Sequence, residues 1–314
     1  MICLGIDTSN YTTSVALYDD ATGEVTQQRR LLKVKPGELG LRQSDAVFQH
    51  TLALPELMRS LFEESGQRPD CIAVSTAPRG EAGSYMPCFM VGKGTADSLG
   101  AAYRLPVRYF SHQAGHIAAA LYSAGRLDWL KKEFLAFHVS GGTTEAVRVS
   151  PDAQALLRTE LVARSLDLKA GQAIDRVGVM LGLAFPAGPA LDELSRQSDK
   201  QYKIKPFLRD GDCSLSGLQN RCEQMKQAGE ADCDIARYCM EYICAALRGM
   251  TRQLTETYPG LPLLYSGGVM SNSLIRERFT KEFGVVFAAP GFSSDNAAGV
   301  AVLGAMRREP KDES

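Results

Sequence analysis

The chain contains few of the residues that most readily reveal a function. Only four of its 314 residues are histidines, and its eight cysteines form no CxxC pair and no zinc-ribbon spacing. Several of the cysteines lie in apolar periodic segments, where a free cysteine behaves as a small apolar side chain. We therefore expect reduced structural thiols rather than disulfides or a cysteine-bound metal cluster.

Long apolar runs and a strong net charge are also missing. No apolar run approaches the roughly 20 residues that a membrane-spanning helix needs. The opening residues, MICLGIDTSN, lack the basic region and cleavage site of a signal peptide, so we expect a cytoplasmic protein with no membrane partner. The net charge of −1 argues against strong nonspecific nucleic-acid binding. Two short basic clusters, within residues 29–35 and 200–205, are expected to be solvated surface.

Strand and helix patterns alternate along the whole chain. Helical periodicity is seen in residues 45–65, 90–105, 112–124 and 293–308, and strand patterns in residues 2–19, 71–75, 107–110, 133–140, 261–268 and 285–290. The stretch 165–250 is mainly helical and is predicted to be an insertion between sheet strands. This order of elements predicts an α/β fold in which helices cover the sheets.

The segment HQAGH, residues 112–116, holds two of the four histidines. A spacing of four residues on a helix places His112 and His116 on one face, about one turn apart. Two neutral imidazoles in this arrangement form half of a metal site. The pattern is equally compatible with two partly buried helix histidines whose nitrogens are hydrogen-bonded within the protein, so the spacing alone leaves both interpretations open.

A second recurring feature is an apolar strand that runs into Ser-Gly-Gly. It occurs at residues 140–142 and again at residues 266–268. Strand ends of this kind let backbone N–H groups approach phosphate oxygens closely, although they also occur as simple tight turns. Together with the Asp-Thr-Ser turn at residues 7–9, the repeat favours a nucleotide cleft between two similar lobes.

Eight ordered blocks of the sequence resemble the TsaD/YgjD family. They are LGIDTSNYTTSVA, FQHTLALP, HQAGH, HVSGGTTEAV, SLDLKAGQAIDRVGVMLGLAFPAGPALDELS, CSLSGLQN, YSGGVMSNSLIRERF and FSSDNAAGVAVLG. The resemblance implies the two-lobed fold shared by actin and the sugar kinases (the ASKHA fold), with a helical insertion. We expect an N-terminal lobe of residues 1–106, completed by the C-terminal helix 293–314, and a C-terminal lobe of residues 107–292.

The resemblance also implies a set of metal ligands. The family holds one divalent ion with both histidines of HxxxH and with the Asp of the final block, which are His112, His116 and Asp295 here. Asp295 is expected to open the last helix, where the helix dipole favours its charge. Some members add a tyrosine at the position of His138, so we infer that His138 is a further ligand. Nitrogen-rich ligation suits zinc or iron better than magnesium.

An adenine nucleotide, either threonylcarbamoyl-AMP or ATP/AMP, is the second ligand that the resemblance implies. Asp175 is expected to accept hydrogen bonds from ribose hydroxyls, and Asn272 to offer a donor and an acceptor beside the second glycine turn. The expected contacts are Ser140, Gly141, Gly142, Thr143, Asp175, Gly188 and Asn272.

The family's reaction moves a threonylcarbamoyl group from its adenylate to the exocyclic amine of the tRNA adenosine beside the anticodon. The resemblance therefore implies an acyltransferase that acts on tRNA and works with small partner proteins of the same pathway. A zinc-peptidase activity is disfavoured, because HQAGH lacks the glutamate that serves as general base in HExxH.

The chain departs from the family pattern mainly at acidic positions. Asp7 replaces a Glu, Asn10-Tyr11-Thr12 replaces Cys-Asp-Glu, and Ala114 replaces the Glu inside HxEGH. Thr143, Gln172 and Leu168 replace His, Glu and Asp. These departures leave two alternatives open. One is a divergent paralogue that transfers to an acceptor other than tRNA, and the other is a non-catalytic nucleotide-binding subunit.

Overall fold

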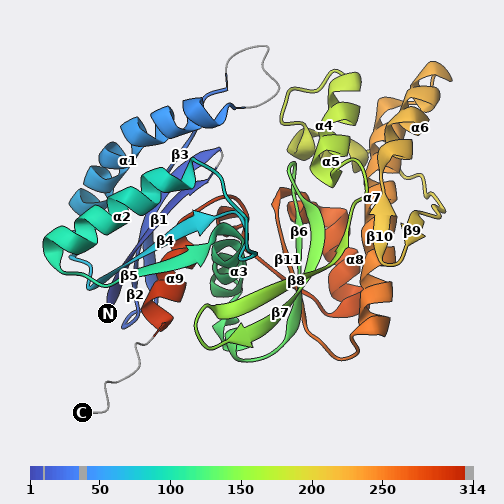
Figure 1. Cartoon of the computed structure of the whole chain (residues 1–314). Helices are drawn as coiled ribbons and strands as arrows, with labels where there is room; N and C mark the ends of the chain where they lie inside the picture. Colours follow the sequence, from blue (N-terminus) through green and yellow to red (C-terminus); the bar gives the residue numbers. More distant parts are fainter. Residues whose placement is uncertain (10, 35–40, 308–314) are drawn as a thin grey trace. The chain divides into compact units, whose positions relative to one another are not determined.

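A computed structural model describes residues 1–9, 11–34 and 41–307 (Figure 1). Asn10, the end of the first basic cluster and residues 308–314 of the predicted C-terminal helix lie outside the described residues. The chain divides into two compact units. Unit 1 comprises residues 1–132, 150–159 and 291–314, and unit 2 comprises residues 133–149 and 160–290.

Unit 1 is built on a five-stranded sheet in the order β3-β2-β1-β4-β5. The hairpin strands β1 and β2 pair antiparallel, β2 pairs antiparallel with β3, and β1, β4 and β5 run parallel. Almost every residue of β1 and β2 is buried, as expected for strands that are covered on both faces. The strand bounds are β1 Ile2–Ser9, β2 Thr12–Asp19, β3 Glu24–Leu31, β4 Cys71–Ala77 and β5 Val107–Ser111.

Among the described residues of unit 1, two pairs of helices lie on the two faces of the sheet. Side chains of β1 point alternately to the two faces, so the strand shows which residues contact each pair. The helices α1 (Gln43–Ser65) and α2 (Phe89–Tyr103) cover the face toward which Thr8 points, since its hydroxyl donates to Cys88 O at the start of α2. The opposite face packs on α9 (Ala298–Met306), where a Cβ on Gly5 would lie 2.4 Å from Ala297 O. Because successive strand residues point to opposite faces, Asp7 lies on the α9 face with Gly5.

Unit 2 contains the second five-stranded sheet, in the order β12-β11-β6-β7-β8. Here β6 runs antiparallel to β7 and parallel to β11. The strands are β6 Phe134–Val139, β7 Thr144–Asp152, β8 Leu156–Arg164, β11 Leu263–Ser266 and β12 Val286–Phe287, and the end of the β7–β8 hairpin is grouped with unit 1.

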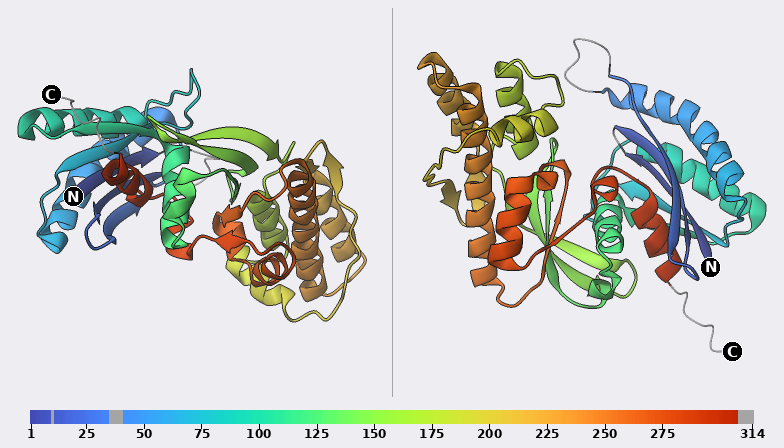
Figure 2. Two further views of the ribbon diagram at one scale, coloured as in Figure 1. Left: turned by 90° about the horizontal axis from the view of Figure 1, so that it is seen from below. Right: turned by 180° about the vertical axis from the view of Figure 1, so that it is seen from behind.

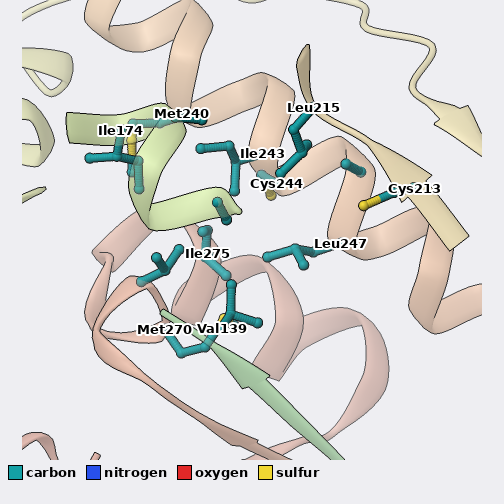
Figure 3. Packing of buried hydrophobic residues seen from close by; sticks show 14 of the residues in the cluster. Val139, Ile174, Cys213, Leu215, Met240, Ile243, Cys244, Leu247, Met270 and Ile275 are labelled. Atoms are coloured by element: carbon teal, nitrogen blue, oxygen red, sulfur yellow. The ribbon is translucent and has the colours of Figure 1, made fainter. Parts of the chain in front are cut away.

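The predicted insertion lies between β8 and β11 and is mainly helical, with one short hairpin. Its long helix α7 contacts each of the other insertion helices and also α8 (Figure 2). Side chains of α7, including Ile243 and Leu247, meet Val139 of β6 and Ile275 of α8 in one apolar core (Figure 3). The elements are α4 Ala170–Met180, α5 Gly188–Ser195, β9 Phe207–Arg209, β10 Asp212–Ser214, α6 Ser216–Gln227, α7 Asp232–Thr257 and α8 Ser273–Phe283.

The division into units differs from the predicted lobe boundary after residue 106. Strand β5 hydrogen-bonds to β4, and the helix α3 (His112–Ser123) that follows it packs on α9. Residues 107–132 therefore belong to unit 1, and unit 2 begins at Glu133. The prediction placed the boundary at Pro106, after the end of a helix, although the sheet of unit 1 continues beyond this residue.

Two further expectations concern the cysteines and membranes. All eight cysteines lie within the described residues and none forms a disulfide, which confirms the prediction of free thiols. Seven of the eight are buried. In the described part of the chain, every helix is too short or too polar to cross a lipid bilayer.

Asp167 joins two of the sequence blocks in unit 2. Its carboxylate accepts from the backbone N–H groups of Leu168, Leu215 and Ser216 and from the Ser214 hydroxyl. Burial raises the pKa of Asp167, but these hydrogen bonds outweigh burial and hold the pKa well below its usual value. The carboxylate therefore stabilises the fold at pH values above about 4, where the unfolded chain also ionises it.

Replacing Asp167 by alanine is expected to lower the free energy of unfolding at pH 7 by about 1 kcal/mol, a modest figure because the side chain is partly exposed. The difference from the parent chain should shrink as the pH falls below about 4, because the unfolded parent chain then binds a proton that the folded Asp167 carboxylate does not. Urea unfolding at several pH values measures this. Asp199→Ala, an exposed carboxylate in the same unit, is the control and should show neither effect.

Candidate metal centre and nucleotide contacts

The first turns of α3 place both histidines of HQAGH as predicted. Ser111 caps the helix by accepting from Ala114 N, so the helix begins at His112 and its next turn carries His116. The two imidazoles turn their Nε2 atoms toward each other, 2.9 Å apart. Two ring nitrogens at this distance must share either a proton or a cation.

Asp295 meets the same two nitrogens. Its Oδ1 lies 3.1 Å from His116 Nε2 and 3.6 Å from His112 Nε2. Among the described residues, these three side chains form the group with metal-binding geometry, and all three belong to unit 1. The sequence-based placement of Asp295 at the start of the last helix was wrong, because α9 begins only at Ala298. The carboxylate is held by the preceding loop instead.

The three side chains fit a divalent ion by their spacing and chemistry. Ligands bound at about 2.1 Å lie about 3.0 Å apart in octahedral geometry and about 3.4 Å apart in tetrahedral geometry. The observed separations of 2.9, 3.1 and 3.6 Å span these values. Two imidazoles and one carboxylate with open positions suit catalytic zinc or non-haem iron better than magnesium.

Asp7 is the important contributor that the sequence-based list of ligands omitted. Its Oδ2 lies 2.7 Å from His112 Nδ1, and its Oδ1 accepts from Ser9 N at 2.9 Å. The carboxylate accepts a hydrogen bond from Nδ1–H and so turns Nε2 of His112 toward Asp295 and His116, where a metal ion would replace the Nε2 proton. The signal available in the sequence was a carboxylate that directly follows the apolar run of a buried strand, where a buried charge needs a specific partner.

In this cluster, each charged group shifts the pKa of its neighbours toward their charged forms. Burial lowers the pKa of His112, but Asp7 and Asp295 outweigh it and raise the pKa to about 10. Burial likewise raises the pKa of Asp7, yet the charge of His112 prevails and holds the pKa of Asp7 below its usual value. The pKa of Asp295 is also lowered, because both histidines outweigh its burial. Two carboxylates thus remain ionised where a cation would bind.

Replacing Asp7 by asparagine is expected to weaken metal binding about 10- to 100-fold while the fold is retained. The amide can keep a contact with His112 but removes the charge that orients the ring and favours a cation. Metal titration by isothermal calorimetry measures the change. Asp19→Asn, on the neighbouring strand β2, is the matched control, and equal affinity in Asp7→Asn and Asp19→Asn would contradict the orienting role.

The loop that carries Asp295 is held from two sides. Arg29 of β3 donates to Ser294 Oγ at 2.6 Å, and Asn296 accepts from Ala298 N at 3.1 Å. Thr12 donates its hydroxyl proton to Asp295 Oδ2 at 3.3 Å. Thr12 stands where the TsaD/YgjD pattern has a glutamate, so a neutral hydroxyl here replaces a second carboxylate beside Asp295.

His138, the fourth predicted ligand, belongs to unit 2 at the end of β6. Its Nδ1 lies 3.1 Å from Ser266 Oγ, and that hydroxyl donates its own proton to Phe137 O. His138 Nδ1 must then be the donor to Ser266, which leaves the lone pair on Nε2. This tautomer is the one that a ligand requires, and metal binding by His138 stays a prediction.

The first Ser-Gly-Gly turn follows β6 directly. Ser140 N donates to Thr143 O at 2.7 Å, and Thr143 N donates to Ser140 Oγ at 3.2 Å. The start of α4 crosses the turn so closely that a Cβ on Gly171 would lie 2.6 Å from Gly141 N. Gly141 and Gly142 themselves are exposed, with no heavy atom near their missing Cβ positions. The side of Gly141 and Gly142 on which a Cβ would lie is therefore open to a ligand.

The remaining predicted nucleotide contacts lie in the same unit. Asp175 is half-buried on α4, and its Oδ1 accepts from Ala187 N just before Gly188 opens α5. Asn272 is buried and already engaged, because it caps α8 through Ile275 N and donates to Asp192 Oδ1 at 2.6 Å. Asn272 thus has fewer hydrogen-bonding groups to offer a ligand than the sequence suggested.

Solved structures share the fold. HypF of T. kodakarensis superposes with a TM-score of 0.61 at 12% identity, over 97% of this chain and 46% of that chain. Component A of the Acidaminococcus fermentans (R)-2-hydroxyglutaryl-CoA dehydratase gives 0.56 at 13% identity, over 97% of both chains. A ROK family glucokinase from Streptomyces griseus gives 0.54 at 11% identity, over 97% of this chain and 99% of that chain. The predicted ASKHA fold is confirmed.

Sequence comparison identifies the family. The model of the TsaD family, tRNA N6-adenosine threonylcarbamoyltransferase, matches residues 23–302. A tRNA N6-adenosine threonylcarbamoyltransferase of Thermus thermophilus is 32% identical over 99% of this chain and 94% of its own length. One from Thiobacillus denitrificans is 32% identical over 98% of this chain and 91% of its own length. The chain therefore belongs to the TsaD family of tRNA N6-adenosine threonylcarbamoyltransferase enzymes.

Proposed function

We propose that this chain transfers a threonylcarbamoyl group from threonylcarbamoyl-AMP to the exocyclic amine of the tRNA adenosine beside the anticodon. The convergence of His112, His116 and Asp295 at 2.9–3.6 Å carries the proposal, because it retains the family's metal ligands in binding geometry. The amine attacks the carbamoyl carbon, the new C–N bond forms, and the bond to the phosphate oxygen of AMP breaks. The amine proton leaves to solvent.

The proposed metal ligands and the proposed nucleotide contacts are assigned separate roles in this reaction. A zinc or iron ion held in unit 1 would, when bound, polarise the carbonyl and offset developing negative charge. In unit 2, backbone N–H groups of the exposed turn at Gly141 and Gly142 would bind the phosphate of the leaving AMP. Asp175 keeps one carboxylate oxygen beyond its contact with Ala187 N and would accept from the ribose hydroxyls. His138 is proposed as an additional nitrogen ligand.

A single assay tests the proposal. The metal-loaded protein is incubated with threonylcarbamoyl-AMP and an unmodified tRNA transcript, with and without the small partner proteins of the pathway. Nucleoside mass spectrometry should detect threonylcarbamoyladenosine, and its amount should equal the AMP released. Zinc-loaded and iron-loaded preparations show which ion supports transfer.

A second candidate is transfer of the same group to an acceptor other than tRNA. Two departures from the family pattern favour it. Thr12 places a neutral hydroxyl on Asp295 where the family pattern has a glutamate. Ala114 is a buried apolar residue at the position of a second glutamate in that pattern. Release of AMP without modification of the tRNA would support this candidate. Binding of the adenylate without any turnover would instead identify a non-catalytic nucleotide-binding subunit.

A further inference from the structure

A basic cavity lies in unit 2, apart from the predicted nucleotide contacts. It is about 400 Å³ and is bounded by α7, α8 and the irregular segment that joins α5 to β9. Cationic side chains from all three elements line it, namely Lys203, Lys205, Arg248 and Arg278. Tyr202 adds an aromatic wall, which is held by a hydrogen bond from its hydroxyl to Asp234 O and by edge contact with Tyr238.

The arginines around this cavity outnumber the carboxylates that pair with them. Buried Glu241 pairs with both Arg278 and Arg237, and Glu282 pairs with both Arg248 and Arg252. One carboxylate between two guanidinium groups leaves one positive charge uncompensated in each set. The glutamates also orient the arginine planes, so that N–H groups not used in the pairs are fixed in direction.

Two lysines add to this excess. Lys203 and Lys205 are exposed, and neither makes an ion pair within the described residues. Four cationic side chains therefore line the cavity with one carboxylate, Glu241, an excess of three positive charges, in a chain whose overall net charge is −1. Such a local excess against a slightly negative background attracts anions selectively to one part of the surface.

The spacing of these cations suits a chain of phosphates better than one small anion. Lys203 and Lys205 lie two residues apart, so their Cα atoms are separated by up to about 7 Å. Arg248 and Arg252 are one helical turn apart on α7, about 6 Å. Pairs of charges at these separations match successive phosphates along a polynucleotide, whereas a single phosphate would be surrounded by converging donors.

We propose that this surface, which we call the basic cavity, binds the backbone phosphates of the RNA acceptor. The choice of RNA rests on the proposed function, since tRNA is the acceptor there. The solvated lysines supply long-range attraction and counterion release, and the oriented arginines hold the backbone in one register. Contacts of this kind carry no base specificity, so the basic cavity strengthens binding of RNA in general.

Binding of a fluorescent tRNA transcript, followed by anisotropy over a range of salt concentrations, tests the proposal. Lys203→Ala/Lys205→Ala should bind about tenfold more weakly than the parent chain, and the slope of log K against log salt should fall by about 2. Arg164→Ala/Lys281→Ala removes the same charge from exposed positions of unit 2 outside the cavity and should leave both quantities unchanged. An RNA hairpin of unrelated sequence should show the same loss.

The outcomes separate this inference from the proposed function. Equal losses of RNA affinity in both double variants would show that the effect comes from net charge alone, and RNA binding at the basic cavity would be rejected. Transfer to tRNA by the parent chain could still stand. Weakened RNA binding in Lys203→Ala/Lys205→Ala, combined with no transfer by the parent chain, would support the cavity and reject the function. Displacement of RNA by millimolar inorganic phosphate at constant ionic strength would overturn the backbone assignment in favour of a small anion.

Discussion

Replacing Asp295 by alanine is expected to weaken metal binding more than about 100-fold, beyond the effect of losing an orienting group such as Asp7. The carboxylate is the one oxygen ligand of the three, and its Oδ1 lies within 3.6 Å of both histidine Nε2 atoms. Without it, the two imidazoles remain 2.9 Å apart, and no negatively charged ligand is left to bind the ion beside them. Threonylcarbamoyl transfer should be lost together with the metal.

Metal content after dialysis, measured by inductively coupled plasma mass spectrometry, gives a readout that does not depend on activity. Asp20→Ala, an exposed carboxylate in the same unit, serves as the matched control and should retain full metal. His112→Ala should behave like Asp295→Ala. Unchanged metal content in both Asp295→Ala and His112→Ala would show that the ion binds elsewhere, and the proposed metal centre would then be wrong.

Replacing Gly299 by alanine is expected to destabilise unit 1 by about 3 kcal/mol, at the upper end of the usual cost of overpacking. A Cβ at this position would lie 1.8 Å from Gly115 O and 2.7 Å from Ala119 N, so α3 and α9 would have to separate. Those helices bring the two halves of the metal centre together, because α3 carries the histidines and Asp295 lies just before α9. Metal affinity should therefore fall with stability.

The single tryptophan offers a local probe for this experiment. Trp129 is buried in unit 1, so its fluorescence during urea unfolding reports on that unit. Gly94→Ala is the matched control, because it lies inside α2 with no heavy atom within 4 Å of the added methyl group. The control should gain about 0.5–1 kcal/mol from its better helix propensity. Equal unfolding midpoints for the two variants would refute close packing of α3 on α9.

Local sequence patterns predicted most of the elements and one half of the metal centre. Residues 71–75 and 133–140 read as buried strands and form β4 and β6, and the HQAGH spacing placed both imidazoles on one face of α3. These features depend on side chains a few residues apart, whose relation is set by helix or strand geometry alone. The resemblance to known sequence blocks then supplied Asp295, which no local pattern could link to HQAGH.

Features that depend on distant packing were missed or misplaced. Asp7 lies 105 residues from His112 in sequence, and only the pairing of β1 with β4 and of β4 with β5 brings its carboxylate to the imidazole. The start of α9 was placed too early at Asp295, because the helix begins only at Ala298, after a loop in which Asn296 accepts a hydrogen bond from Ala298 N. Asn272 was predicted to offer a donor and an acceptor to a ligand, which stays a prediction, and the sequence did not indicate that its amide donates to Asp192 on α5.

The sequence by itself determined the order and type of the elements, the free thiols, the family and the identity of the histidine pair. The tertiary structure decided which carboxylate orients His112, which loop holds Asp295 beside the histidines, and where lysines and arginines gather around one cavity. The physical reason is the range of the interactions. Periodicity reports on neighbours along the chain, whereas metal ligands, buried charge partners and charged surfaces are assembled from segments that only folding brings together.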